Sequence, residues 1–243
     1  MKLCFLRLAL LACTLLPVAA CKSPKPPAPT PTPRTSSTGQ SGSDTDLRQV
    51  SETRRSRPAA NSQPGDFDYY LLNLSWSPEF CQTHPGNAQC AARPGFLVHG
   101  LWPQNNDGTY PQHCTGMTKP PNAAAYLDIM PTIDLIVHEW QTHGTCTGLN
   151  PDGYFSAVRR AFRTVAIPSI FAATQTPPTS IKPDALIAQF SQANPNFPPG
   201  SFAVSCGNNY LTAVEACLDR KLRPQSCQNV RTCRANVIKI APR

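Results

Sequence analysis

The sequence has few charged residues, little glycine and no closely spaced cysteine pair. Only 15% of its 243 residues are charged, and 13 glycines stand beside 27 prolines. This scarcity of glycine excludes a collagen repeat, and the scarcity of charge excludes a coiled coil. Because none of the 11 cysteines forms a Cys-x-x-Cys pair, the chain has neither a zinc ribbon nor a thioredoxin-type site.

No apolar run is long enough to cross a bilayer, and the first segment has the three regions of an export signal. A basic start leads to an apolar run at 8–16, and small residues at 18–20 come directly before Cys21. This pattern resembles the bacterial lipoprotein signal, which implies removal of residues 1–20, lipidation of Cys21 and, with Lys22 next, a place at the outer membrane or in the periplasm. The alternative is an ordinary signal peptide with a chance cysteine.

Residues 22–65 have the composition of a disordered tether. They hold eight prolines among many Ser, Thr and Gln, with almost no large apolar side chain. Such a segment buries too little surface to offset the entropy lost on ordering. We therefore place the globular domain at residues 66–243, which is long enough for one core. Cleavage of the tether would release this domain.

The net charge of +8 is concentrated outside the domain. The signal contributes +2 and the tether +4, whereas the domain holds 13 Lys and Arg against 11 Asp and Glu. General basicity is therefore no argument that the domain binds a polyanion. Any affinity for nucleic acid must come from particular side chains.

Eight of the cysteines lie in the domain. An even number of cysteines in an exported chain predicts disulfides, although the sequence alone does not choose their pairing. The apolar pattern predicts strands toward both ends of the domain and helices in the middle, which is typical of an α+β fold. We expect strands at 67–76, 96–101, 202–206, 210–217 and 237–240, and helices at 134–143, 152–165 and 183–193.

Three of the five histidines lie in two short segments. His99 belongs to Phe-Leu-Val-His-Gly-Leu-Trp-Pro-Gln at 96–104, and the other two to His-Glu-Trp-Gln-Thr-His-Gly-Thr-Cys at 138–146. The second segment is not a zinc-protease helix, because that motif places its histidines four residues apart and these are five apart. Glu139 and His143 do share a helix face, which sets a carboxylate beside an imidazole for acid–base work.

Two imidazoles at separate points of an exported protein suit RNA transesterification. In that reaction the attacking 2′-hydroxyl loses a proton and the departing 5′-oxygen gains one, and imidazole titrates near the operating pH. No metal is needed for either step. The competing interpretation, buried structural histidines, is weak for three histidines taken together.

Both segments resemble the two active-site segments of the ribonuclease T2 family, and residues 68–81 resemble its N-terminal strand. The resemblance covers residues 67–240. It implies an α+β fold with an antiparallel central sheet, helices packed around it and disulfide staples. It also implies a monomeric endoribonuclease that cleaves single-stranded RNA, not DNA, through a 2′,3′-cyclic phosphate to 3′-phosphate products, with no metal or other cofactor and no membrane contact beyond the lipid anchor.

The resemblance also assigns roles to residues. His143 would be the general base and His99 the general acid, or the reverse, while His138 and Glu139 would stabilise the phosphorane. A platform for the substrate base would use Trp102, Gln104 and Tyr110. The disulfides implied are Cys81–Cys90, Cys114–Cys146, Cys206–Cys233 and Cys217–Cys227.

Two positions depart from the family pattern. Thr142 and Val137 stand where many members carry lysine, and the loss of a cation near the phosphorane predicts a slower enzyme, by about 1–3 kcal/mol of transition-state stabilisation. The alternative function is a catalytically weakened RNA-binding or toxin-like surface lipoprotein; a metal-dependent phosphodiesterase is a third. We expect His84 and His113 to be ordinary surface residues.

Overall fold

The structure is a computed structural model that describes residues 57–60, 62–92, 95–115, 122–172 and 179–243. The predicted signal peptide, Cys21 and most of the predicted tether lie outside these ranges. Within them, no helix is both long enough and apolar enough to cross a membrane.

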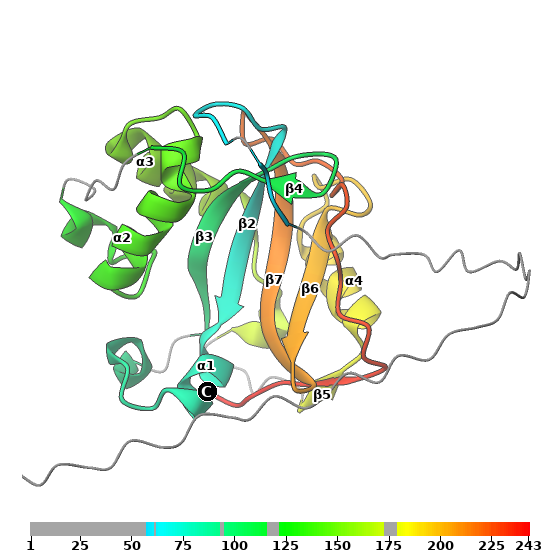
Figure 1. Cartoon of the computed structure of the whole chain (residues 1–243). Coiled ribbons are helices and arrows are strands. Elements are labelled where there is room, and N and C mark those ends of the chain that lie inside the picture. The colour runs from blue at the N-terminus through cyan, green and yellow to red at the C-terminus, as the bar shows by residue number, and fades with distance from the viewer. Residues whose placement is uncertain (1–56, 61, 93–94, 116–121, 173–178) are drawn as a thin grey trace, which may run out of the picture. The chain divides into compact units, whose positions relative to one another are not determined.

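A six-stranded sheet forms the centre of the domain (Figure 1). Its order is β3, β2, β7, β8 and β5, with β6 also paired to β7. All pairings are antiparallel except a short parallel one between β7 and β8. The α+β prediction is confirmed, with a mixed rather than purely antiparallel sheet. The strands are β2 (Tyr69–Trp76), β3 (Phe96–Gln104), β5 (Ser180–Ile181), β6 (Phe202–Gly207), β7 (Tyr210–Asp219) and β8 (Ile238–Lys239).

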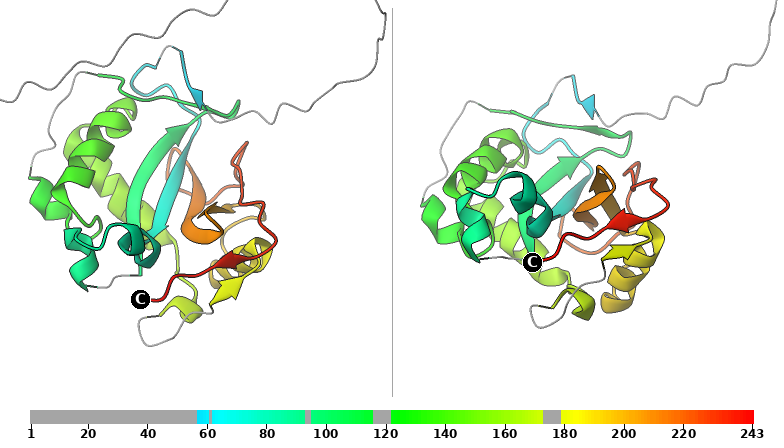
Figure 2. Two further views of the ribbon diagram at one scale, coloured as in Figure 1. Left: turned by 60° about the horizontal axis from the view of Figure 1, so that its bottom comes forward. Right: turned by 90° about the horizontal axis from the view of Figure 1, so that it is seen from below.

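Helices lie beside the strands at the two edges of this sheet. α2 and α3 lie together beside β3, whereas α4 packs against β6 at the other end (Figures 1 and 2). The helices are α1 (Ser77–Thr83), α2 (Ile133–Thr142), α3 (Pro151–Thr164) and α4 (Pro183–Ala193). Short 3-10 turns occupy Ala88–Ala92, Ala123–Tyr126, Gly144–Cys146 and Ser169–Phe171.

Side-chain caps fix where the two helices beside β3 begin. The Thr132 hydroxyl accepts the N–H of Leu135 at 3.2 Å before α2, and Asn150 accepts the N–H of Gly153 at 2.7 Å before α3. Caps of this kind satisfy backbone donors that the first helical turn leaves free. α1 was not among the predicted helices. Its Pro78 lies in the first turn, where the missing N–H of proline breaks no helical hydrogen bond.

The sheet has a deeply buried face and a face that carries the candidate site. Leu72 and Leu74 of β2 are fully buried in the main core, while Leu71 packs on the opposite face with Tyr69 and Trp102. Since alternate residues of a strand point to opposite faces, this separation follows from the strand itself.

Residues 57–60 and 62–65, the N-terminal strap, belong to the folded unit although the sequence analysis assigned them to the tether. β1 (Arg57–Pro58) pairs in parallel with β4 (Thr109–Tyr110). The N–H of Ala59 donates to the Tyr110 carbonyl at 2.9 Å, and the hydroxyl of Ser62 accepts the N–H of Gln112 at 3.3 Å. Hydrogen bonds, and not apolar burial, therefore hold this segment against the domain.

Candidate active site

His99 leaves the regular pattern of β3 at a β-bulge. β2 and β3 pair Asn73 with Gly100 and then Leu74 with Val98, so His99 is the extra residue. Without the bulge, strand alternation would turn His99 toward the core face. The bulge resets the alternation, so Val98 is fully buried whereas the His99 side chain stays 42% exposed.

The end of α2 supplies the other three predicted catalytic side chains. His138 is exposed, Glu139 is buried, and His143 caps the C-terminus of the helix. The N–H of His143 donates to the Glu139 carbonyl at 3.0 Å, so the two residues lie one helical turn apart. Their predicted common face is the one that meets β3.

Glu139 connects Trp102 with His99. The indole N–H of Trp102 donates to Oε2 of Glu139 at 2.7 Å, and Nε2 of His99 lies 3.4 Å from Oε1. Burial raises the pKa of Glu139 to about 8, although the Trp102 hydrogen bond acts to lower it. The carboxyl group therefore holds a proton near neutral pH, within reach of His99.

His143 is held as a neutral imidazole. Burial, followed by the nearby His138, His99 and His113, lowers the pKa of His143 to about 3. Its Nδ1 atom is buried and has no hydrogen-bond partner among the described residues. The pKa of His99 is also lowered, first by burial and then by His138. Unprotonated imidazole is the form that a general base requires.

Two glycines make this arrangement possible. A Cβ on Gly100 would lie 2.0 Å from Oε2 of Glu139 and 2.4 Å from Nε1 of Trp102. A Cβ on Gly144 would lie 2.4 Å from the Trp140 ring. Both glycines belong to the two segments singled out in the sequence, and steric space is the reason for each.

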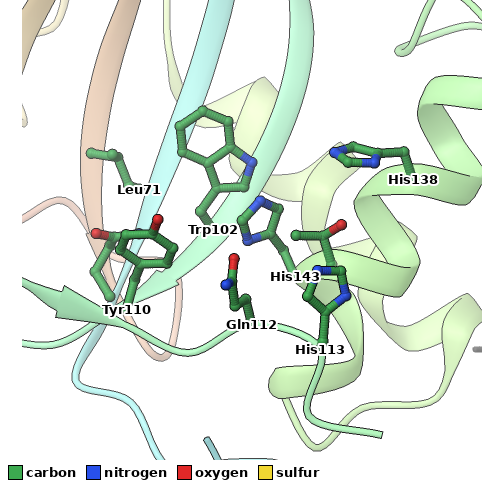
Figure 3. Close-up of a pocket in the computed structure, with 9 residues that line it drawn as sticks. Leu71, Trp102, Tyr110, Gln112, His113, His138 and His143 are labelled. Atoms are coloured by element: carbon green, nitrogen blue, oxygen red, sulfur yellow. The ribbon is translucent and has the colours of Figure 1, made fainter. Parts of the chain in front are cut away.

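A pocket of about 560 Å³ opens beside Trp102 (Figure 3). Trp102, Gln104 and Tyr110, the predicted platform, line it together with His138 and His143. The ring centroids of Trp102 and His143 are 5.3 Å apart, and those of Trp102 and His99 are 5.7 Å apart. The remaining lining residues are Leu71, Gln112, His113 and Thr142.

The structure changes the interpretation of some residues. His113 was expected to be an ordinary surface residue, but it lines the pocket at the end that holds His138 and His143 (Figure 3). Gln112 was not singled out at all. The sequence signal available for His113 and Gln112 was that they come just before Cys114, which forms a disulfide with Cys146 of the second histidine segment. His84 is indeed exposed, and it stacks on Phe80 with ring centroids 4.3 Å apart.

The described part of the chain holds four disulfides, with the pairing that the resemblance implies. Cys114–Cys146 joins the loop after β4 to the turn after α2, so it ties two walls of the pocket together. The other three are Cys81–Cys90, Cys206–Cys233 and Cys217–Cys227. Within the described ranges, no group of three or more His, Cys, Asp or Glu residues is arranged to hold a metal ion.

Comparison with known proteins identifies relatives of the domain. The model of the ribonuclease T2 family matches residues 67–227. A ribonuclease of Aeromonas hydrophila is 44% identical over 93 residues, covering 37% of this chain and 43% of that protein. Ribonuclease DdI of Dictyostelium discoideum is 28% identical over 181 residues, covering 66% of this chain and 77% of that protein. A probable ribonuclease of Haemophilus influenzae is 29% identical, with 67% and 61% covered.

Solved structures share the fold. An RNase-related protein from Calystegia sepium superposes with a TM-score of 0.59 at 24% identity, covering 72% of this chain and 97% of its own. RNase NT in complex with 5′-AMP superposes with a TM-score of 0.56 at 18% identity, covering 73% of this chain and 99% of its own.

Proposed function

Because this chain belongs to the ribonuclease T2 family, we propose that it is an endoribonuclease that cleaves single-stranded RNA by metal-independent transesterification. The observation that carries the proposal is a pair of imidazoles that differ in protonation, with ring centroids 5.7 Å (His99) and 5.3 Å (His143) from that of Trp102. His143 is held unprotonated, and His99 lies 3.4 Å from a carboxyl group that retains its proton. A proton acceptor and a proton source are what transesterification needs.

In the proposed first step, His143 takes the proton of the 2′-hydroxyl as that oxygen attacks phosphorus. The bond from phosphorus to the 5′-oxygen breaks, and His99 protonates the departing oxygen. The negative charge of the bound phosphate favours transfer of the Glu139 proton to His99, which prepares the acid. In the second step the roles reverse: His99 deprotonates water, which opens the cyclic phosphate, and His143 returns its proton to the 2′-oxygen.

The remaining residues would bind the substrate. His138 is exposed at the pocket, where its imidazole would stabilise the charged phosphorane. Glu139 is buried behind the pocket and would act on the phosphorane by holding the site in its geometry. The indole of Trp102 donates its N–H to Glu139, and its ring remains to stack on a base. Gln104 and Tyr110 would complete this platform. The nucleotide bound in the RNase NT structure supports a nucleotide-binding role for this fold.

The test is incubation of the purified domain with RNA and with DNA in excess chelator. We expect 2′,3′-cyclic phosphates and then 3′-phosphates from RNA, and intact DNA. His99→Ala and His143→Ala should each lower kcat by roughly 10²–10⁴-fold. Intact RNA with measurable RNA binding would favour the RNA-binding or toxin-like alternative, and loss of cleavage in chelator would favour a metal-dependent phosphodiesterase. Full activity of the double variant would refute the assignment of the two histidines.

We further propose that the domain is exported, works as a monomer, and is held in the outer membrane or periplasm by lipid on Cys21. The support is the order of charged, apolar and small residues before Cys21. Metabolic labelling with a radioactive fatty acid should label the wild-type chain and not a Cys21→Ser variant. An unlabelled wild-type chain would leave the ordinary signal peptide as the explanation.

A further inference from the structure

The candidate pocket must hold an anion, yet it offers no permanent positive charge. Among the described residues that line it, none is a lysine or an arginine. An RNA phosphate carries a negative charge, and the charge at phosphorus grows in the transition state. The donors for its oxygens must therefore come from imidazoles, hydroxyls and amides.

His113 lies at the end of the pocket where these donors gather. It lines the same cavity as His138 and His143, and Figure 3 shows all three around one end, with Tyr110 and Leu71 at the other. Its side chain is exposed. Because Tyr110 of the platform lies at the far end and Trp102 lies between the two ends, the end near His113 is where a phosphate attached to a stacked nucleoside would lie.

The backbone of His113 is fixed on both sides. Its N–H donates to the carbonyl of Thr142, the last residue of α2, at 2.8 Å. The next residue, Cys114, is joined to Cys146. His113 also has a φ of 51°, a left-handed conformation that few residues other than glycine adopt. The imidazole is therefore presented by a rigid support rather than by a free loop.

The imidazoles at the pocket repel one another when protonated. His138, His99 and His113 all act to lower the pKa of His143, after burial. An anion among them removes this repulsion, because each imidazole N–H then faces a negatively charged oxygen. The buried hydroxyl of Thr142, which lacks a partner among the described residues, lies in the same wall.

We infer that His113 is a substrate-binding residue whose imidazole N–H donates to a nonbridging oxygen of the RNA phosphate at the His138–His143 end of the pocket. This inference rests on the proposed function and adds a residue to it. A hydrogen bond to a charged group predicts a roughly tenfold effect on affinity. The effect falls on binding, since His113 takes no proton from the reacting oxygens.

The test compares His113→Gly with a matched control. Glycine adopts a positive φ without strain, so it removes the imidazole and keeps the backbone. We expect KM for a short RNA and the inhibition constant of inorganic phosphate to rise roughly tenfold, with kcat within about threefold of the wild type. His84→Ala, which removes an exposed histidine stacked on Phe80, should leave all three values unchanged.

A second measurement separates binding from turnover and from misfolding. In the wild-type domain, titration with inorganic phosphate should shift the imidazole resonances of His113 in an NMR spectrum. If the wild type cleaves no RNA but these resonances still move, the phosphate site stands and the proposed activity fails. Unmoved His113 resonances while those of His143 shift, or unchanged KM and inhibition constants in a folded His113→Gly variant, would overturn the inference.

Discussion

Gly100 of β3 lies directly beside the hydrogen bond between the Glu139 carboxyl group and the indole N–H of Trp102. Gly100 is not needed for a left-handed backbone conformation here, because its φ is not positive. Because glycine has no Cβ, it leaves room on the site face for the hydrogen-bonded Glu139 and Trp102 side chains. A site made by packing a helix against a strand depends on such small residues as much as on its titratable ones.

Gly100→Ala should therefore damage the site without touching a histidine. The added methyl group would force the Glu139 carboxyl group away from Trp102, at a cost of about 1–3 kcal/mol of unfolding free energy. We expect kcat/KM on RNA to fall at least tenfold, measured beside a thermal unfolding curve. Gly86→Ala is the control, since no atom lies within 4 Å of its added Cβ. Equal activity of the two variants would contradict this account.

The residue types and spacing of two segments singled out the four catalytic candidates, and the family resemblance added the platform. The structure brings these residues together beside Trp102, and their roles stay predictions. His113 and Gln112 were not predicted, because their one local signal, the nearby Cys114, points to the pocket only through its disulfide with Cys146. They reach the pocket through long-range contacts: the hydrogen bond from His113 to Thr142, and the bond from Gln112 to Ser62. Periodicity and local motifs do not predict such contacts.

At the scale of elements, the sequence predicted the helices around the site well because their apolar residues recur at helical spacing. Asn150 and Pro151 fix the start of α3 within one residue of the predicted position. The N-terminal strap was missed because it pairs with β4 through backbone hydrogen bonds, which any sequence can make. The bulge at His99 was missed as well, since a register shift depends on the partner strand.

The strap supports the pocket wall that carries Tyr110 and Gln112. A domain that begins at Asp66 should therefore bind RNA less well than one that begins at Arg57. Losing the hydrogen bonds from Ala59 and to Ser62 should raise KM roughly threefold to tenfold, with kcat little changed. Steady-state kinetics on the two truncated forms would show this. Identical KM values would mean that the wall of the pocket holds its shape unaided.

The stability of the whole molecule should depend on pH through buried groups whose pKa shifts have opposite signs. Burial raises the pKa of Glu139 from 4.5 to about 8 and that of Glu215 from 4.5 to about 7. The folded state then binds more protons than the unfolded state above pH 4.5, so these groups lower the unfolding free energy as pH rises. For His143, lowered from 6.5 to about 3, the folded state binds fewer protons, so stability falls as pH drops below 6.5.

These signs predict a maximum of stability near pH 4.5, because above that pH the two glutamates lower the unfolding free energy more than the one histidine raises it. Denaturant titrations across pH would show it. Glu215→Gln keeps the hydrogen bonds from Asn73 and Ser205 but removes the titration, so it should be more stable than the wild type at pH 8 by about 3 kcal/mol and nearly equal at pH 4. Asp66→Asn, an exposed carboxyl, is the control. A constant difference between wild type and Glu215→Gln at both pH values would refute the role of Glu215.

The strand order has a consequence for how the protein is made. β2 is near the beginning of the domain, but its second neighbour in the sheet is β7, which is near the end of the chain. While a ribosome is still producing the residues between them, β2 and β3 have only each other to pair with, and an isolated hairpin is marginally stable at best. The histidines are therefore not assembled on a stable sheet until synthesis is almost complete.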